Sequence, residues 1–149
     1  MYNLNGEYDV KMDSKGRLRL PSVLMSQIGE RDVRLVVNRG FEKCLLLYPE
    51  EVWIEKTKEV NQLNPYIKKN REFSRYFYRG ATVLNADATG RILLPKLLCD
   101  FAGIKQDLVL LAYHQQIEIW AKEQYLNMVD REPGDFSALA EEVFGHKDV

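Results

Sequence analysis

Residues 13–21 read DSKGRLRLP and residues 87–95 read DATGRILLP, so the chain carries one pattern twice at an offset of 74 residues. Each copy begins with Asp, whose carboxylate can accept hydrogen bonds from the backbone that follows it, and has Gly at its fourth position, where a turn can need a positive φ. The alternating residues after the Gly predict a short strand, which a proline ends. The residues predicted to form the two turns are Asp13, Gly16, Asp87 and Gly90.

The sequence around each turn has the same order of predicted elements. The first copy predicts strands over 8–12, 17–20, 33–38 and 43–48, with a short helix over 21–28. The second copy predicts strands over 82–86, 91–94, 107–113 and 116–120, with a short helix from Pro95. About 40 residues of this kind bury little apolar surface, so the two copies, or copies from several chains, are expected to interlock. The predicted class is therefore α+β.

The rest of the chain is predicted to be helical. Pro49 followed by two glutamates, and Asn64-Pro65, are typical helix starts. The stretch after Pro65 mixes basic and aromatic residues, and we interpret its cations as a solvated helix face in preference to a second nucleic-acid patch; they are Lys68, Lys69, Arg71, Arg75 and Arg79. The tail predicts an amphipathic helix over 135–144, with an apolar side made of Phe136, Leu139, Val143 and Phe144.

The predicted organisation is a first module over 7–54, a helical connector over 55–80, a second module over 81–124 and a helical tail over 125–149.

Composition places the chain among ordinary soluble proteins. Hydrophobic residues make up 46% of the 149 residues and charged residues 29%. No apolar run approaches the roughly 20 residues that span a bilayer, and the N-terminal stretch MYNLNGEYDV has neither the basic flank nor the apolar core of a signal peptide. We therefore expect a cytoplasmic protein.

The net charge of −1 hides an asymmetry between the two halves. Residues 1–80 carry 15 Lys and Arg against 11 Asp and Glu, which gives +4, whereas residues 81–149 carry 6 against 11, which gives −5. Local charge decides where a polyanion can bind, so this distribution permits DNA binding without requiring it.

Reactive residues are few, and their spacing predicts neither a metal site nor an enzyme. Cys44 and Cys99 stand in apolar surroundings, which favours buried free thiols. His114 and His146 have no second ligand at metal-binding spacing. No Ser/His/Asp set, carboxylate pair or phosphate-binding glycine loop accompanies the repeated turn. We expect no catalysis, no cofactor and no small-molecule substrate.

The repeated turn offers cations that could contact DNA. If Tyr8, Val10 and Met12 face inward, four cations face outward together on one exposed hairpin; they are Lys11, Lys15, Arg17 and Arg19. A two-stranded ribbon fits the DNA major groove, where Arg can bond guanine and Lys suits phosphates. In the second copy the matching residues are Asn85, Thr89, Arg91 and Leu93, so a single cation is retained.

This difference predicts a division of labour between the copies. The first copy would mainly read DNA and the second would mainly complete the fold or an assembly. Arg91 would then be a secondary contact to a phosphate, or a partner of Asp87. The structural alternative for Arg17 is an ion pair with Asp13 across the turn.

A duplicated D-x-x-G-R turn, each copy followed by Pro and a short helix, together with the run CLLLYPEEVW, resembles the MraZ family within the AbrB-like swapped-hairpin group. The resemblance covers nearly the whole chain. It implies two tandem swapped-hairpin β modules with a small barrel-like core. It also implies a DNA-binding regulator of the bacterial cell division and cell wall gene cluster, a ring-shaped homo-oligomer, and DNA contacts from the D-x-x-x-R motif, which here is Asp13 to Arg17 and Asp87 to Arg91.

The partners expected from this resemblance are double-stranded DNA, at repeated short sites in the promoter of the protein's own operon, and further copies of the chain. Such a protein would lie in the cytoplasm, associated with the nucleoid. Two other functions stay open. One is a protein-interaction module of the antitoxin kind, in which the acidic tail holds a partner, and the other is a structural ring with no specific DNA binding.

Overall fold

A computed structural model of the chain describes residues 2–29, 33–130 and 134–145. These residues form eight strands, which are β1 (Gly6–Lys11), β2 (Arg17–Arg19), β3 (Arg34–Arg39), β4 (Leu45–Pro49), β5 (Thr82–Asn85), β6 (Arg91–Leu93), β7 (Asp107–Tyr113) and β8 (Gln116–Ala121). They also form six helices, which are α1 (Ser22–Ile28), α2 (Glu50–Asn61), α3 (Lys68–Tyr78), α4 (Lys96–Ala102), α5 (Lys122–Asp130) and α6 (Phe136–Gly145). The predicted α+β class is confirmed.

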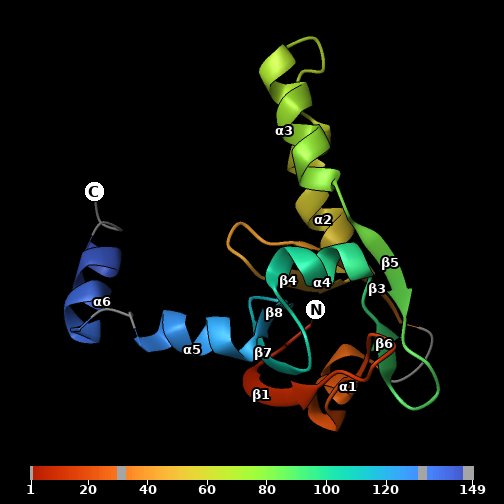
Figure 1. Ribbon diagram of the computed structural model, residues 1–149. Helices are drawn as coiled ribbons and strands as arrows, with labels where there is room; N and C mark the ends of the chain where they lie inside the picture. The colour runs from red at the N-terminus through yellow and green to blue at the C-terminus, as the bar shows by residue number, and fades with distance from the viewer. Residues whose placement is uncertain (1, 30–32, 131–133, 146–149) are drawn as a thin grey trace.

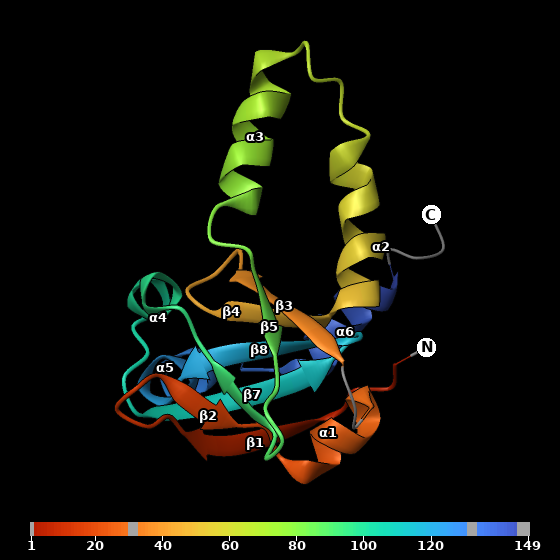
Figure 2. The same ribbon diagram turned by 90° about the vertical axis from the view of Figure 1, so that its right-hand side faces the viewer.

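The strands form two sheets that mix the two copies of the repeat. The larger sheet is antiparallel, with strand order β1-β7-β8-β4-β3-β5, and the smaller pairs β2 with β6. Strand β1 of the first copy therefore lies against β7 of the second, and β5 of the second lies against β3 of the first. The expected interlocking of the copies is present at both edges of the larger sheet (Figure 2).

The barrel-like core expected from the resemblance is wrong. Among the described residues, β1 and β5 are the two edges of the larger sheet and do not pair with each other. The reason is that β2 and β6 pair with each other in a separate sheet, so neither links the two edges. The two copies nevertheless share one hydrophobic core.

This shared core repeats the offset seen in the sequence. Equivalent positions of the two copies are apolar and at most 3% exposed, namely Leu18 with Ile92, Leu20 with Leu94, and Leu24 with Leu98. The apolar alternation of the short strands and the first turns of α1 and α4 supply these side chains. One copy alone would leave them in water, so each copy stabilises the other.

Two helical parts extend from the sheets. Helices α2 and α3 form a hairpin that projects from the sheet, whereas α5 leads away from β8 toward α6 (Figure 1). The C-terminal end of α3 is fixed to β3, because Asn38 Nδ2 donates to the Phe77 carbonyl at 2.7 Å and Arg39 Nη2 to the Tyr76 carbonyl at 2.6 Å. None of the helices in the described ranges is long and apolar enough to cross a membrane.

Candidate nucleic-acid interface

The repeated turns lie at the two ends of one antiparallel strand pair. In this pair Arg17 lies opposite Leu93, Leu18 opposite Ile92 and Arg19 opposite Arg91. The pairing is extended by two hydrogen bonds of 2.9 Å, in which the N–H of Leu94 donates to the Gly16 carbonyl and the N–H of Leu20 to the Gly90 carbonyl. We call residues 13–20 and 87–94 the crossed ribbon, because each copy contributes one strand and one turn.

This arrangement differs from the self-contained hairpin predicted for each copy. Beyond the isolated bridge between Met12 and Leu18, β1 pairs with β7 and β2 pairs with β6. The turn itself forms as predicted, but the strands that it joins belong to different sheets. A hairpin would leave the buried side of each short strand without a partner, whereas the crossed ribbon covers Leu18 and Ile92, which are each 1% exposed.

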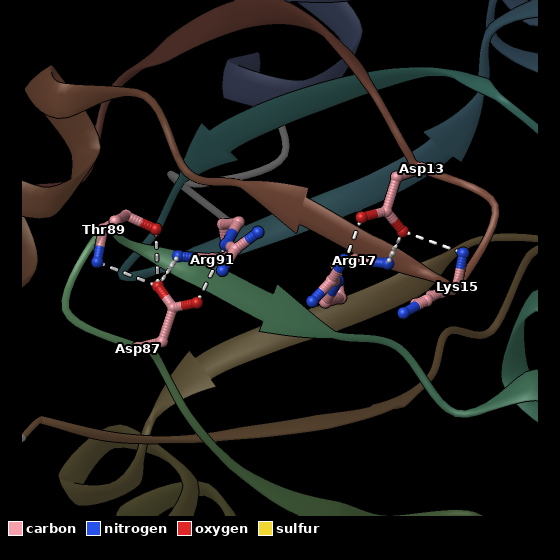
Figure 3. Close-up of polar contacts among 6 residues, drawn as sticks. All are labelled: Asp13, Lys15, Arg17, Asp87, Thr89 and Arg91. Carbon is pink, nitrogen blue, oxygen red and sulfur yellow. Dashed lines mark hydrogen bonds and ion pairs between the residues drawn. The ribbon is translucent and has the colours of Figure 1, made fainter.

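Each turn is held by its aspartate. Asp13 Oδ1 accepts hydrogen bonds of 2.9 Å from the N–H groups of Lys15 and Arg17. Asp87 Oδ1 accepts the equivalent bonds from Thr89 and Arg91, also at 2.9 Å, and a further bond of 2.8 Å from the Thr89 hydroxyl (Figure 3). These bonds confirm the role of turn formers that the sequence predicts for the two aspartates.

The glycines of the turns adopt the conformation for which glycine was predicted. Gly16 has φ +86° and Gly90 has φ +82°, in the region that other residues rarely adopt. Their N–H groups close the turns by donating to the carbonyls of Asp13 and Asp87 at 3.1 and 3.0 Å. The two turns are therefore the same structure built from different intervening residues.

The aspartates also orient the arginines that follow them. Arg17 Nε donates to Asp13 Oδ2 at 2.9 Å, and Arg91 Nε donates to Asp87 Oδ2 at 2.8 Å (Figure 3). The ion pair considered as the structural alternative is thus present in both copies. These pairs are solvent-exposed and contribute little to stability. Each one uses Nε, so the terminal nitrogens of the guanidinium are left for another acceptor.

Both aspartates are ionised at neutral pH. The pKa of Asp13 lies below its usual value, chiefly because its carboxylate accepts the backbone N–H of Arg17. The pKa of Asp87 is lowered as well, first by the backbone N–H of Arg91 and then by the Thr89 hydroxyl. Hydrogen bonds to the charged form favour it, so the turns keep their geometry throughout the neutral range.

The crossed ribbon gathers cations from both copies on its exposed face. Directly opposite residues of a strand pair point to one face, so Arg19 and Arg91 share the face away from Leu18 and Ile92. Arg17 lies at the other end of the same face, with Lys15 in the adjoining turn. Each end of the ribbon therefore carries two cations, and Arg91 lies beside Arg19.

The charge on this face is only partly compensated. Like charges directly opposite each other destabilise a strand pair. In the part of the chain that the structure describes, neither Lys15 nor Arg19 has a carboxylate within the 4.0 Å of an ion pair. An anion bound across the ribbon would relieve this repulsion.

Lys11, the fourth cation predicted for this surface, lies elsewhere. It ends β1, which pairs with β7, and its Nζ is 3.8 Å from Asp107 Oδ1. The prediction that Lys11, Lys15, Arg17 and Arg19 share one hairpin is therefore wrong. The side chains alternate as expected along each strand, but β1 and β2 do not remain side by side.

One member of the crossed ribbon is absent from the predicted site residues. Arg91 is predicted there as a secondary contact, and the structure places it opposite Arg19. Leu93 is not predicted, yet it is 54% exposed on the cationic face. The signal that could place Arg91 and Leu93 is the repeat itself. If the copies interlock with two-fold symmetry and the buried Leu18 lies opposite its equivalent Ile92, then Arg19 faces Arg91 and Arg17 faces Leu93.

A hollow elsewhere on the molecule has the opposite charge. A hollow of about 700 Å³ lies between the helical hairpin and the sheet, and its lining includes Glu42, Glu55, Glu59 and Glu118. Carboxylates at this density disfavour a polyanion. Among the described residues, no cluster of three or more His, Cys, Asp or Glu side chains could hold a metal ion. Cys44 and Cys99 are free and buried, as predicted.

Comparisons with known proteins identify the family. A family model described as MraZ protein, putative antitoxin-like, matches residues 4–76 and again residues 77–147. A Flavobacterium psychrophilum protein named transcriptional regulator MraZ is 42% identical over 98% of this chain and 94% of its own length. Proteins of the same name from Christiangramia forsetii and Cytophaga hutchinsonii are 41% and 33% identical, over 99% and 92% of this chain and 97% and 91% of their own lengths. The resemblance seen in the repeated turn is thus confirmed over nearly the full length, and the chain belongs to the MraZ family.

Proposed function

We propose that this protein is a sequence-specific DNA-binding transcriptional regulator, and that the crossed ribbon is its DNA-contacting surface. The observation that carries the proposal is the placement of Arg19 opposite Arg91 on an exposed face, between two turns that hold further cations. The names of the relatives support the regulatory role, since the three compared proteins are called transcriptional regulators. The same names favour a protein without catalytic activity.

The size of the ribbon suits one major groove. Gly16 faces Leu94 and Gly90 faces Leu20, so the two turns lie four residue steps apart along the ribbon, a span of about 13 Å. The paired strands lie about 4.8 Å apart, and the major groove is about 12 Å wide. In this arrangement Arg19 and Arg91 reach base edges, while Arg17 and Lys15 contact bases or the adjacent phosphates.

The aspartates contribute by fixing two of the arginines before DNA binds. Arg17 and Arg91 are each held by a bond from Nε, so less side-chain freedom is lost on binding than for an unrestrained arginine. Neither Asp13 nor Asp87 need contact DNA. Lys11, at the end of β1, is a candidate for a flanking phosphate contact once its weak pair with Asp107 opens.

One ribbon with four cations binds weakly at physiological salt, because each neutralised phosphate adds only about 0.9 to the salt slope. We propose that several copies form a ring-like homo-oligomer and bind repeated short sites in the promoter of their own operon. That operon would belong to the cell division and cell wall cluster, and the protein would lie in the cytoplasm at the nucleoid. Exposed apolar side chains on α6, such as Phe136 at 78% and Val143 at 57%, support contact between copies.

Fluorescence anisotropy tests the proposal with duplex DNA from upstream of the protein's own operon and a scrambled duplex of equal composition. We expect selective binding of the upstream DNA, lost in Arg19→Ala with Arg91→Ala. Lys69→Ala is the matched control, because Lys69 is exposed on α3 and lies outside the ribbon. Selective binding that survives the ribbon variant but fails in the control would place the interface on α3.

A protein-interaction role is the second candidate. The family description includes the words putative antitoxin-like, and the acidic α6 exposes apolar side chains that a partner could cover. This function predicts no preference for the upstream DNA in the same anisotropy experiment, with the oligomer intact by light scattering.

A further inference from the structure

We propose that Leu93 contacts the 5-methyl group of a thymine in the bound DNA and so adds a base preference that the arginines do not supply. The proposal rests on the proposed function, because it takes the crossed ribbon as the DNA-contacting surface. Within the paired strands of the ribbon, Leu93 is the residue at which an apolar side chain replaces a cation, since its equivalent in the first copy is Arg19.

The exposure of Leu93 is not explained by the fold. Its neighbours Ile92 and Leu94 are 1% and 3% exposed and lie in the shared core, whereas Leu93 is 54% exposed on the opposite face. It lies directly across from Arg17 and shares its face with Arg19 and Arg91. A large apolar side chain among cations has no favourable interaction with water, but burying it against an apolar group of a ligand would lower the free energy of the complex.

The position of this side chain is restricted by the turn beside it. The place that a Cβ on Gly16 would occupy lies 3.6 Å from Leu93 Cδ1 and 3.3 Å from the Leu94 carbonyl oxygen. Leu93 therefore packs beside the backbone of the first turn, next to the arginine that Asp13 orients. An apolar group held in this way can meet a ligand with little loss of freedom.

In the DNA major groove one apolar group is available for recognition, the 5-methyl group of thymine. Arginines on the same face suit guanine, so the two kinds of side chain read different bases. With Leu93 and Arg17 at one end, and Arg19 and Arg91 at the other, the ribbon has a direction. A single subunit would then bind an asymmetric site in one orientation.

The experiment replaces thymines by deoxyuridine, one at a time, in the upstream duplex that the wild-type protein binds. Deoxyuridine lacks the methyl group and keeps every hydrogen-bonding atom, so the protein is unchanged and its folding is not at issue. Burial of one methyl corresponds to about a fourfold change in affinity. We expect one thymine in each site whose replacement weakens wild-type binding by about this factor.

Leu93→Ala should bind the thymine duplex less tightly and should no longer respond to deoxyuridine at that position. Leu97→Ala is the matched control, because Leu97 is 82% exposed on α4 and does not belong to the ribbon; it should keep the full response. If wild-type binding is selective but insensitive to every deoxyuridine, or if Leu93→Ala keeps the wild-type response, the contact is overturned and the proposed function stands. Absence of selective binding by the wild type would overturn both.

Discussion

At the scale of single residues, Asp13 and Asp87 connect the repeated pattern to its geometry. Each carboxylate accepts two backbone N–H groups with Oδ1 and the Nε of an arginine with Oδ2. A side chain that accepts three or more bonds from within its own turn is fixed by local sequence. This explains why both turns could be predicted from the letters D-x-x-G-R alone.

These bonds make the stability of the folded protein depend on pH. The pKa of both aspartates is lower in the folded protein than the value of about 3.9 in an unfolded chain. Their contribution is therefore present above pH 4 and is lost as the pH falls through the folded pKa values. Replacing both by Asn should flatten the decline of the unfolding midpoint below pH 4, measured by circular dichroism against the wild type. An equal decline in the variant would show that other carboxylates account for it.

The arginines make a second prediction at this scale. The sequence alone predicts that Arg91→Ala weakens DNA binding less than Arg17→Ala, since the second copy has lost its other cations. The position of Arg91 beside Arg19 predicts instead that Arg91→Ala and Arg19→Ala cause similar losses, about 1 to 3 kcal/mol each if they contact bases. Anisotropy titrations of the single variants measure this. A negligible loss for Arg91→Ala would restore the division of labour between the copies.

At the scale of elements, the crossed ribbon depends on its two glycines. Gly16 combines a positive φ of +86° with a contact of 3.3 Å between an added Cβ and the Leu94 carbonyl oxygen. Gly103 has φ +66° and nothing within 4 Å of an added Cβ, so it reports the backbone strain alone. Comparing alanine substitutions at Gly16 and Gly103 therefore distinguishes the cost of a positive φ from the cost of steric crowding.

Gly16→Ala should therefore destabilise the protein more than Gly103→Ala. Both positions have a positive φ, which costs about 1 to 2 kcal/mol in a residue with a Cβ, and only in the Gly16 variant does the added Cβ also press on the Leu94 carbonyl oxygen. Denaturant unfolding of the two variants measures the difference. Equal losses would mean that the Leu94 backbone moves aside at no cost.

The elements also show what could be read from the sequence and what could not. The strands and short helices lie within about two residues of their predicted bounds, because alternation, prolines and turn residues are local signals. The strand partners of β1 and β2 differ from the predicted hairpins, because pairing between copies is decided by burial of Leu18 and Ile92 in a core that both copies share. For the same reason the sequence predicts Lys11 beside Arg17 and Arg19, whereas the structure places Leu93 there.

At the scale of the whole molecule, the proposed DNA binding requires several copies of the chain to act together. A subunit of net charge −1 is a poor ligand for DNA, but several crossed ribbons on one assembly would multiply modest contacts.

Light scattering of the purified protein should give a mass that is a multiple of the 17.4 kDa subunit. Replacing Phe136 and Val143 on α6 by Ser should lower this mass, since both side chains are exposed and apolar. Phe41→Ser is the control, because Phe41 is 88% exposed in the loop between β3 and β4. A monomeric wild type at micromolar concentration would contradict the assembly, and an unchanged mass in the α6 variant would place the contact on another surface.

The most direct test of the crossed ribbon compares the selectivity and the salt dependence of DNA binding in the wild type, in Arg19→Ala with Arg91→Ala, and in Lys15→Ala. Arg19 and Arg91 are proposed to reach base edges, so their removal should abolish the preference for the upstream duplex over the scrambled one. Lys15 is proposed to contact a phosphate, so its removal should reduce the slope of log K against log salt by about 0.9 for each ribbon engaged and keep the preference. Lost selectivity in the arginine variant together with a reduced slope in the lysine variant is the predicted result. An arginine variant that still prefers the upstream duplex as strongly as the wild type would show that the DNA lies on a different surface.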